Sequence, residues 1–274
     1  MSINLAEKYS KKVADRYAVR SLTDAYAGKE YDFSGASTVI VYTVDTVSTV
    51  NYSRTGTERF GPIEELGDTK QEMQLTRDRA FTFSIDAGNS EQQFNIKQAN
   101  ACLKRELDEV VTPEIDSYRL SVWSAGAGTE ISAPSGGLTK DNIVEQIFTL
   151  SATMSNGYVP TVNRALFIPE MTFLKFKLSD VVMGGPSLGE KVVRNGYKGT
   201  IDGMDVITVP SVIFPESSLF IIKQRSATCD PMQLRNFRVQ KNHMGIDGDV
   251  CEGRYIYDSF VLSSRAKGVG ACRA

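Results

Sequence analysis

Residues 38–86 read TVIVYTVDTVSTVNYSRTGTERFGPIEELGDTKQEMQLTRDRAFTFSID. The outgoing limb, residues 39–52, is rich in Val, Thr and Tyr, and the returning limb, residues 72–85, alternates apolar with polar side chains. This pattern predicts two strands of a long ribbon joined by a charged tip. A two-stranded ribbon has too little apolar surface to be stable alone in water, so we expect a neighbouring copy of the same chain to cover it.

The tip and the returning limb carry charges of both signs. Mixed charge of this kind suits pairing between subunits, because charge complementarity sets the register of an interface more than its affinity. Head-to-tail contacts can close into rings around a symmetry axis. The candidate inter-subunit contacts are therefore Arg54, Glu58, Arg59, Glu64, Glu65, Lys70, Arg77 and Arg79.

The longest helical pattern of the chain follows the ribbon. A Gly-Asn-Ser turn supplies an N-cap, and apolar residues then recur at helical spacing, which predicts a helix over residues 89–111. We expect this helix to end at Thr112 and Pro113, because the residue before a proline disfavours the helical conformation. Thr112 is then expected to cap a second helix that ends before Gly126.

The middle of the chain alternates helical and strand patterns. The expected elements are a loop before residue 139, a helix over 139–156 stopped by Gly157, a buried strand over 165–168, a helix over 169–178 and a Gly-rich loop over 183–199. Residues 199–210 then read as a hairpin, because the pair Asp202-Gly203 tolerates the positive φ of a tight turn.

Strand patterns return near the C-terminus, over residues 219–222, 234–240 and 251–263. Asp247-Gly248 indicates a hairpin connection between the last two. We expect these strands to pair beside the long helix, so the fold class is α+β.

Composition excludes several classes of function. The 274 residues include 31 basic and 33 acidic side chains, so the net charge of −2 creates no global field for nucleic acid or an anionic membrane. The four cysteines, Cys102, Cys229, Cys251 and Cys272, lack the spacing of a metal site and are interpreted as reduced, intracellular thiols. The N-terminus has no signal peptide, and no apolar run approaches the ~20 residues that span a bilayer.

No catalytic signature stands out either. The single histidine, His243, is interpreted as a solvated turn residue, and no nucleophile motif accompanies it. The stretch from Gly184 to Ser187 matches neither phosphate-loop fingerprint, and acidic pairs such as Asp108-Glu109 suit solvated or salt-bridging roles. We therefore expect no enzyme activity, no metal and no cofactor.

Residues 4–17 predict a short amphipathic helix with an apolar stripe and several lysines on its other faces. Two interpretations remain open for this helix. It is a solvated basic helix, or it is an arm that docks on another subunit or faces an internal polyanion.

The order of these elements resembles that of the major capsid proteins of tailed bacteriophages, the Hong Kong 97-type fold. The resemblance covers nearly the whole chain from about residue 31. The stretches that carry it are YDFSGASTVIVYTV, NYSRTGTERFG, DRAFTFSIDAGNSEQ, VVTPEIDSYRLS, GTIDGMDVITVP and GRYIYDSFVLSSRAKGVGA.

The resemblance implies a division of the chain. Residues 1–37 would be an N-terminal arm and residues 38–86 an extended loop with its leading strand. Residues 87–113 and 226–274 would form a peripheral domain with a long spine helix, whose sheet would use strands near 36–46 and 230–265. Residues 114–225 would form an axial α/β domain.

The resemblance also implies partners and a location. The chain would self-assemble into hexamers and pentamers of an icosahedral phage head, enclose double-stranded DNA without sequence readout, and have no membrane partner. A portal, a separate scaffolding protein and a decoration protein are the other expected partners, the scaffold because no long helical N-terminal extension is present. The protein would reside in the virion after assembly in the host bacterial cytoplasm. Some relatives cross-link a loop lysine to an asparagine, and Lys70 is the one lysine of this ribbon.

Two other functions remain alternatives. An encapsulin-type nanocompartment shell uses the same fold to enclose a cargo enzyme. A tail-tube or other ring-forming phage component would form open rings or tubes instead of closed shells.

Overall fold

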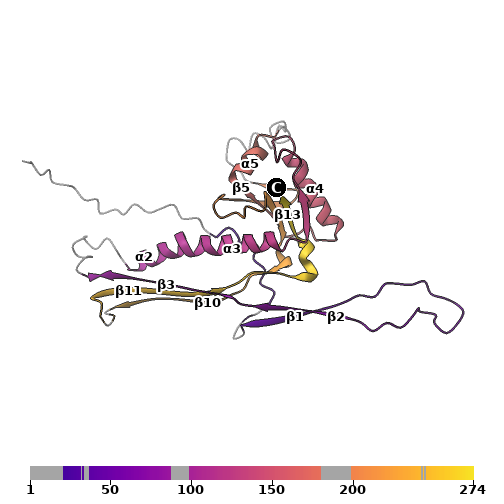
Figure 1. Ribbon diagram of the computed structural model, residues 1–274, viewed down its shortest axis with the longest axis horizontal. Helices are drawn as coiled ribbons and strands as arrows, with labels where there is room; N and C mark the ends of the chain where they lie inside the picture. Colours follow the sequence, from indigo (N-terminus) through magenta and orange to yellow (C-terminus); the bar gives the residue numbers. More distant parts are fainter. Residues whose placement is uncertain are drawn as a thin grey trace, which may run out of the picture.

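The computed structural model describes residues 21–31, 33, 37–87, 99–179, 199–241, 243 and 245–274, with the side chains of residues 234 and 235 left out. Figure 1 shows an elongated molecule. A three-stranded sheet and a two-stranded ribbon run end to end along one side, a long helical rod lies over the sheet, and a compact α/β domain stands above the junction. The expected helix over residues 4–17 lies outside the described residues.

The base of the ribbon is made by β1 (Thr38–Val44) and β2 (Asp68–Gln74), which pair antiparallel. The predicted pair of strands is therefore confirmed, although strand geometry ends at Val44 and not at residue 52. Beyond Val44, the Asp45 amide donates to the Gly67 carbonyl at 2.9 Å, so the two limbs of the ribbon stay together where the regular strand pairing stops.

The prediction of one returning strand over residues 72–85 is wrong. β2 ends at Gln74, and β3 (Arg77–Asp86) starts a separate strand that belongs to another sheet. Between them Thr76 is held by the Asp258 carboxylate through both its amide (2.8 Å) and its hydroxyl (2.9 Å). A local pattern of alternation does not show this break, because the bond that makes it comes from a distant part of the chain.

The three-stranded sheet has the order β10-β11-β3, with β10 (Met232–Lys241) and β11 (Gly248–Tyr257) joined as the expected antiparallel hairpin. β3 pairs with β11 along its whole length. The strand near residues 36–46 that was expected in this sheet pairs with β2 alone, because β3 already occupies the free edge of β11.

The rod consists of α2 (Ala99–Glu106), a π-helical turn over Leu107–Val111 (η2) and α3 (Thr112–Ala125), which follow one another without a break. The predicted helix end at Thr112 and Pro113 is therefore wrong. The Thr112 amide and hydroxyl both donate to the Leu107 carbonyl, the hydroxyl at 2.9 Å. This wider turn accommodates a proline that lacks an N–H and would otherwise clash with the preceding turn. Residues 89–98 of the predicted helix lie outside the described residues.

The compact domain is built on a mixed six-stranded sheet of order β4-β13-β8-β5-β7-β6. Its strands are β4 (Thr129–Ser132), β5 (Arg164–Pro169), β6 (Thr200–Ile201), β7 (Met204–Val209), β8 (Phe220–Gln224) and β13 (Val269–Arg273). Helices α4 (Ile143–Asn156) and α5 (Glu170–Lys177) cover one face, where Leu166 and Ile168 of β5 are buried. The other face, with Phe167, packs on Leu120 and Trp123 of α3, so the end of the rod is the second cover of this sheet.

Most expected elements of this domain are confirmed. α4 starts at Ile143 and not at residue 139, and Gly157 ends it as predicted. The β6–β7 hairpin turns through Asp202 (φ 51°) and Gly203 (φ 72°), as its residue pair indicates. Residues 183–198 of the expected Gly-rich loop lie outside the described residues.

Two strands of the sheet were not predicted, β4 inside an expected loop and β13 at the C-terminal end. The expected last strand stops at Tyr257 and is followed by the short β12 (Phe260–Val261), which pairs with β9 (Thr228–Cys229). Three short 3-10 turns, η1 (Asp24–Tyr26), η3 (Arg225–Ala227) and η4 (Ser263–Gly268), complete the described elements. Among the described residues, no helix is long and apolar enough to cross a membrane.

Candidate assembly surface

One face of the ribbon base packs on the body of the same chain. Val39 and Val41 of β1 lie beside Met73 of β2, which is fully buried, and this group packs on Cys229 and Leu262. The alternation of a strand therefore directs every second side chain of β1 inward. The ribbon is attached to the molecule by an apolar contact at its base.

The opposite face of β1 and the tip beyond it carry apolar side chains that the chain leaves in solvent. Tyr42 is 61% exposed and Phe60 is 84% exposed. The full set is Ile40, Tyr42, Val44, Val47, Val50, Tyr52, Phe60, Ile63 and Leu66. So many exposed large apolar side chains on one projecting element indicate an interaction site, because a monomeric protein rarely leaves a large apolar patch in water.

The ribbon, which we also call the extended arm, carries six charged residues that are all exposed: Arg54, Glu58, Arg59, Glu64, Glu65 and Lys70. Within the described part of the chain, none of these six side chains forms an ion pair. Lys70 stands directly opposite Tyr42 in the β1–β2 register, so it borders the exposed apolar row. The tip therefore offers apolar surface and unpaired charge of both signs together.

The structure places Arg77 and Arg79 elsewhere. Both lie on β3 and face the rod, where the Arg79 Nε lies 2.8 Å from a Glu114 oxygen and the Arg77 guanidinium lies 4.5 Å from the centre of the Tyr118 ring. These two arginines join the sheet to the rod within one chain, so they are not brought together with the charges of the tip.

Asp258 fixes the point where the ribbon leaves the body. Its carboxylate is buried and accepts four bonds, two from Thr76, one from the Tyr118 hydroxyl (2.7 Å) and one from the Ser259 amide (2.8 Å). Burial, and then the bond to Asp258, raises the pKa of Tyr118. This carboxylate joins the ribbon to the rod. Asp258 was not among the residues predicted from the sequence, although an Asp-Ser pair inside an apolar strand pattern is a signal for such an anchor.

A second polar anchor lies on β2. The Gln71 side chain donates to the Val261 carbonyl and accepts from the Ser263 amide, both at 2.9 Å. Together with Asp258 it fixes the direction in which the ribbon projects. The extended arm is thus anchored to the body at its base, and the apolar side chains of its outer face are exposed to solvent along its length.

The entering N-terminal segment is fastened to the body by a buried ion pair. Lys223 and Asp230 have fully buried side chains, with Nζ and Oδ2 3.4 Å apart. Asp230 accepts from the Gly28 amide at 2.9 Å, and Lys223 donates to the Tyr26 carbonyl at 2.6 Å. Burial lowers the pKa of Lys223 to about 8, against the attraction of Asp230. Burial alone would raise the pKa of Asp230, but Lys223 and the surrounding donors hold it below its usual value.

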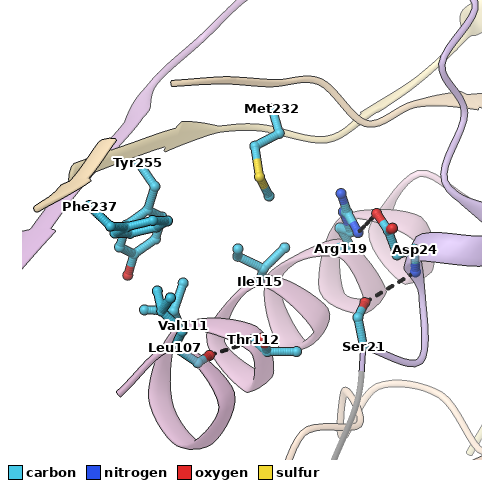
Figure 2. A pocket seen from close by; sticks show the side chains of 10 residues that line it. All are labelled: Ser21, Asp24, Leu107, Val111, Thr112, Ile115, Arg119, Met232, Phe237 and Tyr255. Carbon is cyan, nitrogen blue, oxygen red and sulfur yellow. Dashed lines mark hydrogen bonds and ion pairs between the residues drawn. The ribbon is translucent and has the colours of Figure 1, made fainter. Parts of the chain in front are cut away.

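A hollow with a volume of about 210 Å³ lies between the rod and the three-stranded sheet. Figure 2 shows the side chains that line it. Ile115, Met232 and Phe237 contribute an apolar lining, and Arg119 lies at its polar end. The Arg119 side chain donates to the Thr23 hydroxyl at 3.1 Å and lies 3.6 Å from an oxygen of Asp24. The polar end of this hollow therefore holds the N-terminal segment against α3.

The described residues show no arrangement typical of catalysis or of metal binding. His243 lies exposed in the connection between β10 and β11. No group of three or more His, Cys, Asp or Glu side chains that could hold a metal ion occurs among the described residues. The extended arm is thus the feature that the fold presents most prominently to a partner.

No protein-family model matches this sequence, and no curated protein matches it either. Solved structures do match over almost the whole chain. A structure from Mycobacterium phage Che8 superposes with a TM-score of 0.80 at 16% identity, covering 98% of this chain and 96% of that chain.

Two further matches are described as capsids. The capsid structure of cyanophage P-SCSP1u has a TM-score of 0.79 at 12% identity, over 98% of this chain and 92% of that one. The mature capsid of bacteriophage PhiM1 has a TM-score of 0.74 at 9% identity, with the same coverage of each chain. The chain therefore has the α+β, Hong Kong 97-like fold of phage capsid proteins.

Proposed function

We propose that this protein is the major capsid protein of a tailed bacteriophage, which assembles into an icosahedral head around double-stranded DNA. The agreement of fold over nearly the whole chain with phage capsid structures is the observation that carries this proposal. The exposed apolar face of the extended arm supports this proposal independently, because an arm attached only at its base needs a neighbouring subunit to cover that face.

In the proposed shell, the arm lies across a neighbouring subunit. The neighbour buries the row that includes Tyr42 and Phe60, and the hydrophobic effect supplies most of the affinity. The charges of the tip then select the register, since a displaced arm would bring like charges together. Arg54, Glu58, Arg59, Glu64, Glu65 and Lys70 are the contacts proposed for this role.

We assign the parts of the chain to the proposed shell as follows. Residues 1–37 are the N-terminal arm, 38–86 the extended loop, 87–113 with 226–274 the peripheral domain, and 114–225 the axial domain around five-fold and six-fold positions. β3 closes the extended-loop range but pairs with β11, so it joins the loop to the peripheral sheet. β13, at the end of the 226–274 range, pairs with β4 and β8 in the six-stranded sheet, so it joins the C-terminal end of the peripheral range to the compact domain. Hexamers and pentamers, a portal, a scaffolding protein and a decoration protein complete the proposed assembly.

Contact with the packaged DNA is proposed to be non-specific. The net charge of −2 provides no global attraction to DNA, so enclosure and local contacts account for retention. The protein is accordingly placed in the virion, after assembly in the host bacterial cytoplasm.

Electron microscopy of the purified protein, expressed with and without its neighbouring genes, tests the proposal. Closed icosahedral particles are expected, and particles that contain double-stranded DNA would separate a genome container from a cargo compartment. Particles filled with an enzyme would identify a nanocompartment. Open rings or tubes under every condition would contradict the shell and indicate a tail component.

A further inference from the structure

Two cysteines meet where the rod packs on the three-stranded sheet. Cα atoms of α2 and β11 approach within 8 Å of one another. Cys251 of β11 is fully buried, and its thiol donates to the Ala99 carbonyl at 3.7 Å. Cys102, half-buried, stands three residues beyond Ala99, which places it on the same side of the helix one turn further on.

The other two cysteines are far from this contact in the fold. Cys229 is buried under the ribbon base, beside Met73 and Leu262, and Cys272 is buried in the compact domain. All four cysteines are free thiols. Among the four, Cys102 and Cys251 are therefore the pair that lies at one packing contact, that of α2 with β11.

The titration of Cys251 agrees with this placement. Burial raises the pKa of the Cys251 thiol, and the neighbouring Cys102 raises it further. An effect of Cys102 on the pKa of Cys251 places the two groups near each other, because such an interaction weakens with distance.

We propose that Cys102 and Cys251 are a modification site, and that a small-molecule disulfide oxidises them to a bond that staples the rod to the sheet. A disulfide requires Cα atoms about 4.4–6.8 Å apart, and the contact of α2 with β11, where Cα atoms come within 8 Å of one another, brings the two backbones near this range. The inference concerns a single chain and holds whether or not the chain forms shells.

The exchange needs no other reactant. The half-exposed Cys102, as a thiolate, attacks one sulfur of the oxidant, which releases one thiol and leaves a mixed disulfide on Cys102. The Cys251 thiolate then attacks the Cys102 sulfur and releases the second thiol. Two protein thiols are oxidised, one small-molecule disulfide is reduced to two thiols, and the protons of the protein thiols pass to the two released groups.

The bond would lock the first helix of the rod, α2, to β11 of the three-stranded sheet. In a reducing cytoplasm the thiols stay free, so the rod can adjust against the sheet. In an oxidising medium the staple fixes α2 on β11 and raises the thermal midpoint of unfolding, because it restricts the unfolded chain.

The test treats the purified full-length protein with oxidised glutathione in mildly alkaline buffer, blocks free thiols in denaturant, and maps the peptides by mass spectrometry. The expected result is a peptide pair joining Cys102 to Cys251, the loss of two of the four free thiols and a higher thermal midpoint that dithiothreitol reverses.

Variants make the result specific. Cys102→Ser, at a half-exposed position that tolerates serine, should abolish both the linked peptide and the rise in midpoint, whereas Cys229→Ala should retain them. Circular dichroism checks that each variant is folded. A lasting glutathione adduct on Cys102, four free thiols after treatment, or a bridge that includes Cys229 or Cys272 would each overturn the proposal.

Discussion

At the scale of single residues, three carboxylates hold together elements that are far apart in the sequence; Asp258 and Asp230 are buried, and Glu114 is partly exposed. Asp258 joins the ribbon to the rod, Asp230 joins the N-terminal segment to the body, and Glu114 joins the rod to the sheet. Each accepts several bonds, so the loss of one carboxylate leaves several donors without a partner.

Replacement of Asp258 should therefore destabilise the subunit. Asp258→Ala leaves the Thr76 amide and the Tyr118 hydroxyl unpaired, and we expect the free energy of unfolding to fall by about 2 kcal/mol. Denaturant unfolding measures it. Asp78→Ala removes a carboxylate whose pair with Arg254 lies at the surface, and it is the control, with a much smaller expected loss. Equal losses in the two variants would show that Asp258 is no anchor.

The Tyr255 hydroxyl should make stability depend on alkaline pH. Burial, and then the bond to Glu114, raises the pKa of Tyr255 from 10.0 to about 12. Between these values the unfolded chain loses the proton while the folded chain keeps it, so this group's contribution to stability is lost as pH rises from 10 to 12. Tyr255→Phe should therefore show a shallower fall in the free energy of unfolding over this range. Parallel pH profiles for the two proteins would contradict the assignment.

At the scale of elements, the two faces of the ribbon differ in what they contact. One face packs on the body around Met73, and the other presents the row that includes Tyr42. The rod also has two roles, since it covers the three-stranded sheet along its length and the six-stranded sheet at its end. These elements join the parts of the chain into one frame.

Substitutions on the outer face of the ribbon should affect assembly, whereas substitutions on the packed face should affect the stability of the subunit. Tyr42→Asp places a charge on an exposed position, so the free energy of unfolding of the subunit should change by no more than about 0.5 kcal/mol while assembly is lost. Met73→Ala creates a cavity in the packed face and should cost about 2–5 kcal/mol. Unfolding curves and particle yield measure the two effects. Normal shells from Tyr42→Asp would contradict the role of the outer face.

The contact of β13 with α4 should depend on the absence of a side chain at Gly270. A Cβ there would lie 2.8 Å from the Met154 sulfur and 3.0 Å from a Leu150 methyl carbon. Gly270→Ala should cost little if the flexible Met154 moves, whereas Gly270→Val should lower the free energy of unfolding by about 1–3 kcal/mol. Thermal unfolding of the Gly270→Ala and Gly270→Val variants measures this loss of stability. Equal midpoints for the two variants would show that the packing around Gly270 is loose.

The sequence predicted the elements whose evidence is local. α4 and β5 follow from apolar spacing, and the Asp202-Gly203 hairpin follows from its turn residues. β13 was missed because its small residues show no alternation and are buried on both faces.

Other features depend on distant partners. The break at Thr76 requires Asp258, which stands 182 positions away, and the division of charges between the tip and β3 requires knowledge of the rod. The apolar side chains of β1 could be predicted as part of a strand, but their exposure to solvent follows only from the packing of the whole chain.

At the scale of the whole molecule, we predict that the body folds without the outer part of the ribbon, residues 46–66, but does not assemble without it. Val44 and Asp68 close the regular ladder, and Asp45 and Gly67 are already bonded beyond it. An Asn-Gly turn in place of residues 46–66 would therefore close a short hairpin without disturbing β1 or β2. The shortened subunit should unfold at the wild-type midpoint and form no shells, and normal shells would show that the arm is dispensable.

The most direct measurement is a cryo-electron microscopy reconstruction of particles formed by the full-length protein. We predict a closed icosahedral shell in which the ribbon of each subunit lies on a neighbouring subunit, with Tyr42 and Phe60 buried against that neighbour. A shell in which these side chains remain in solvent, or a protein that forms only monomers or open tubes, would contradict it.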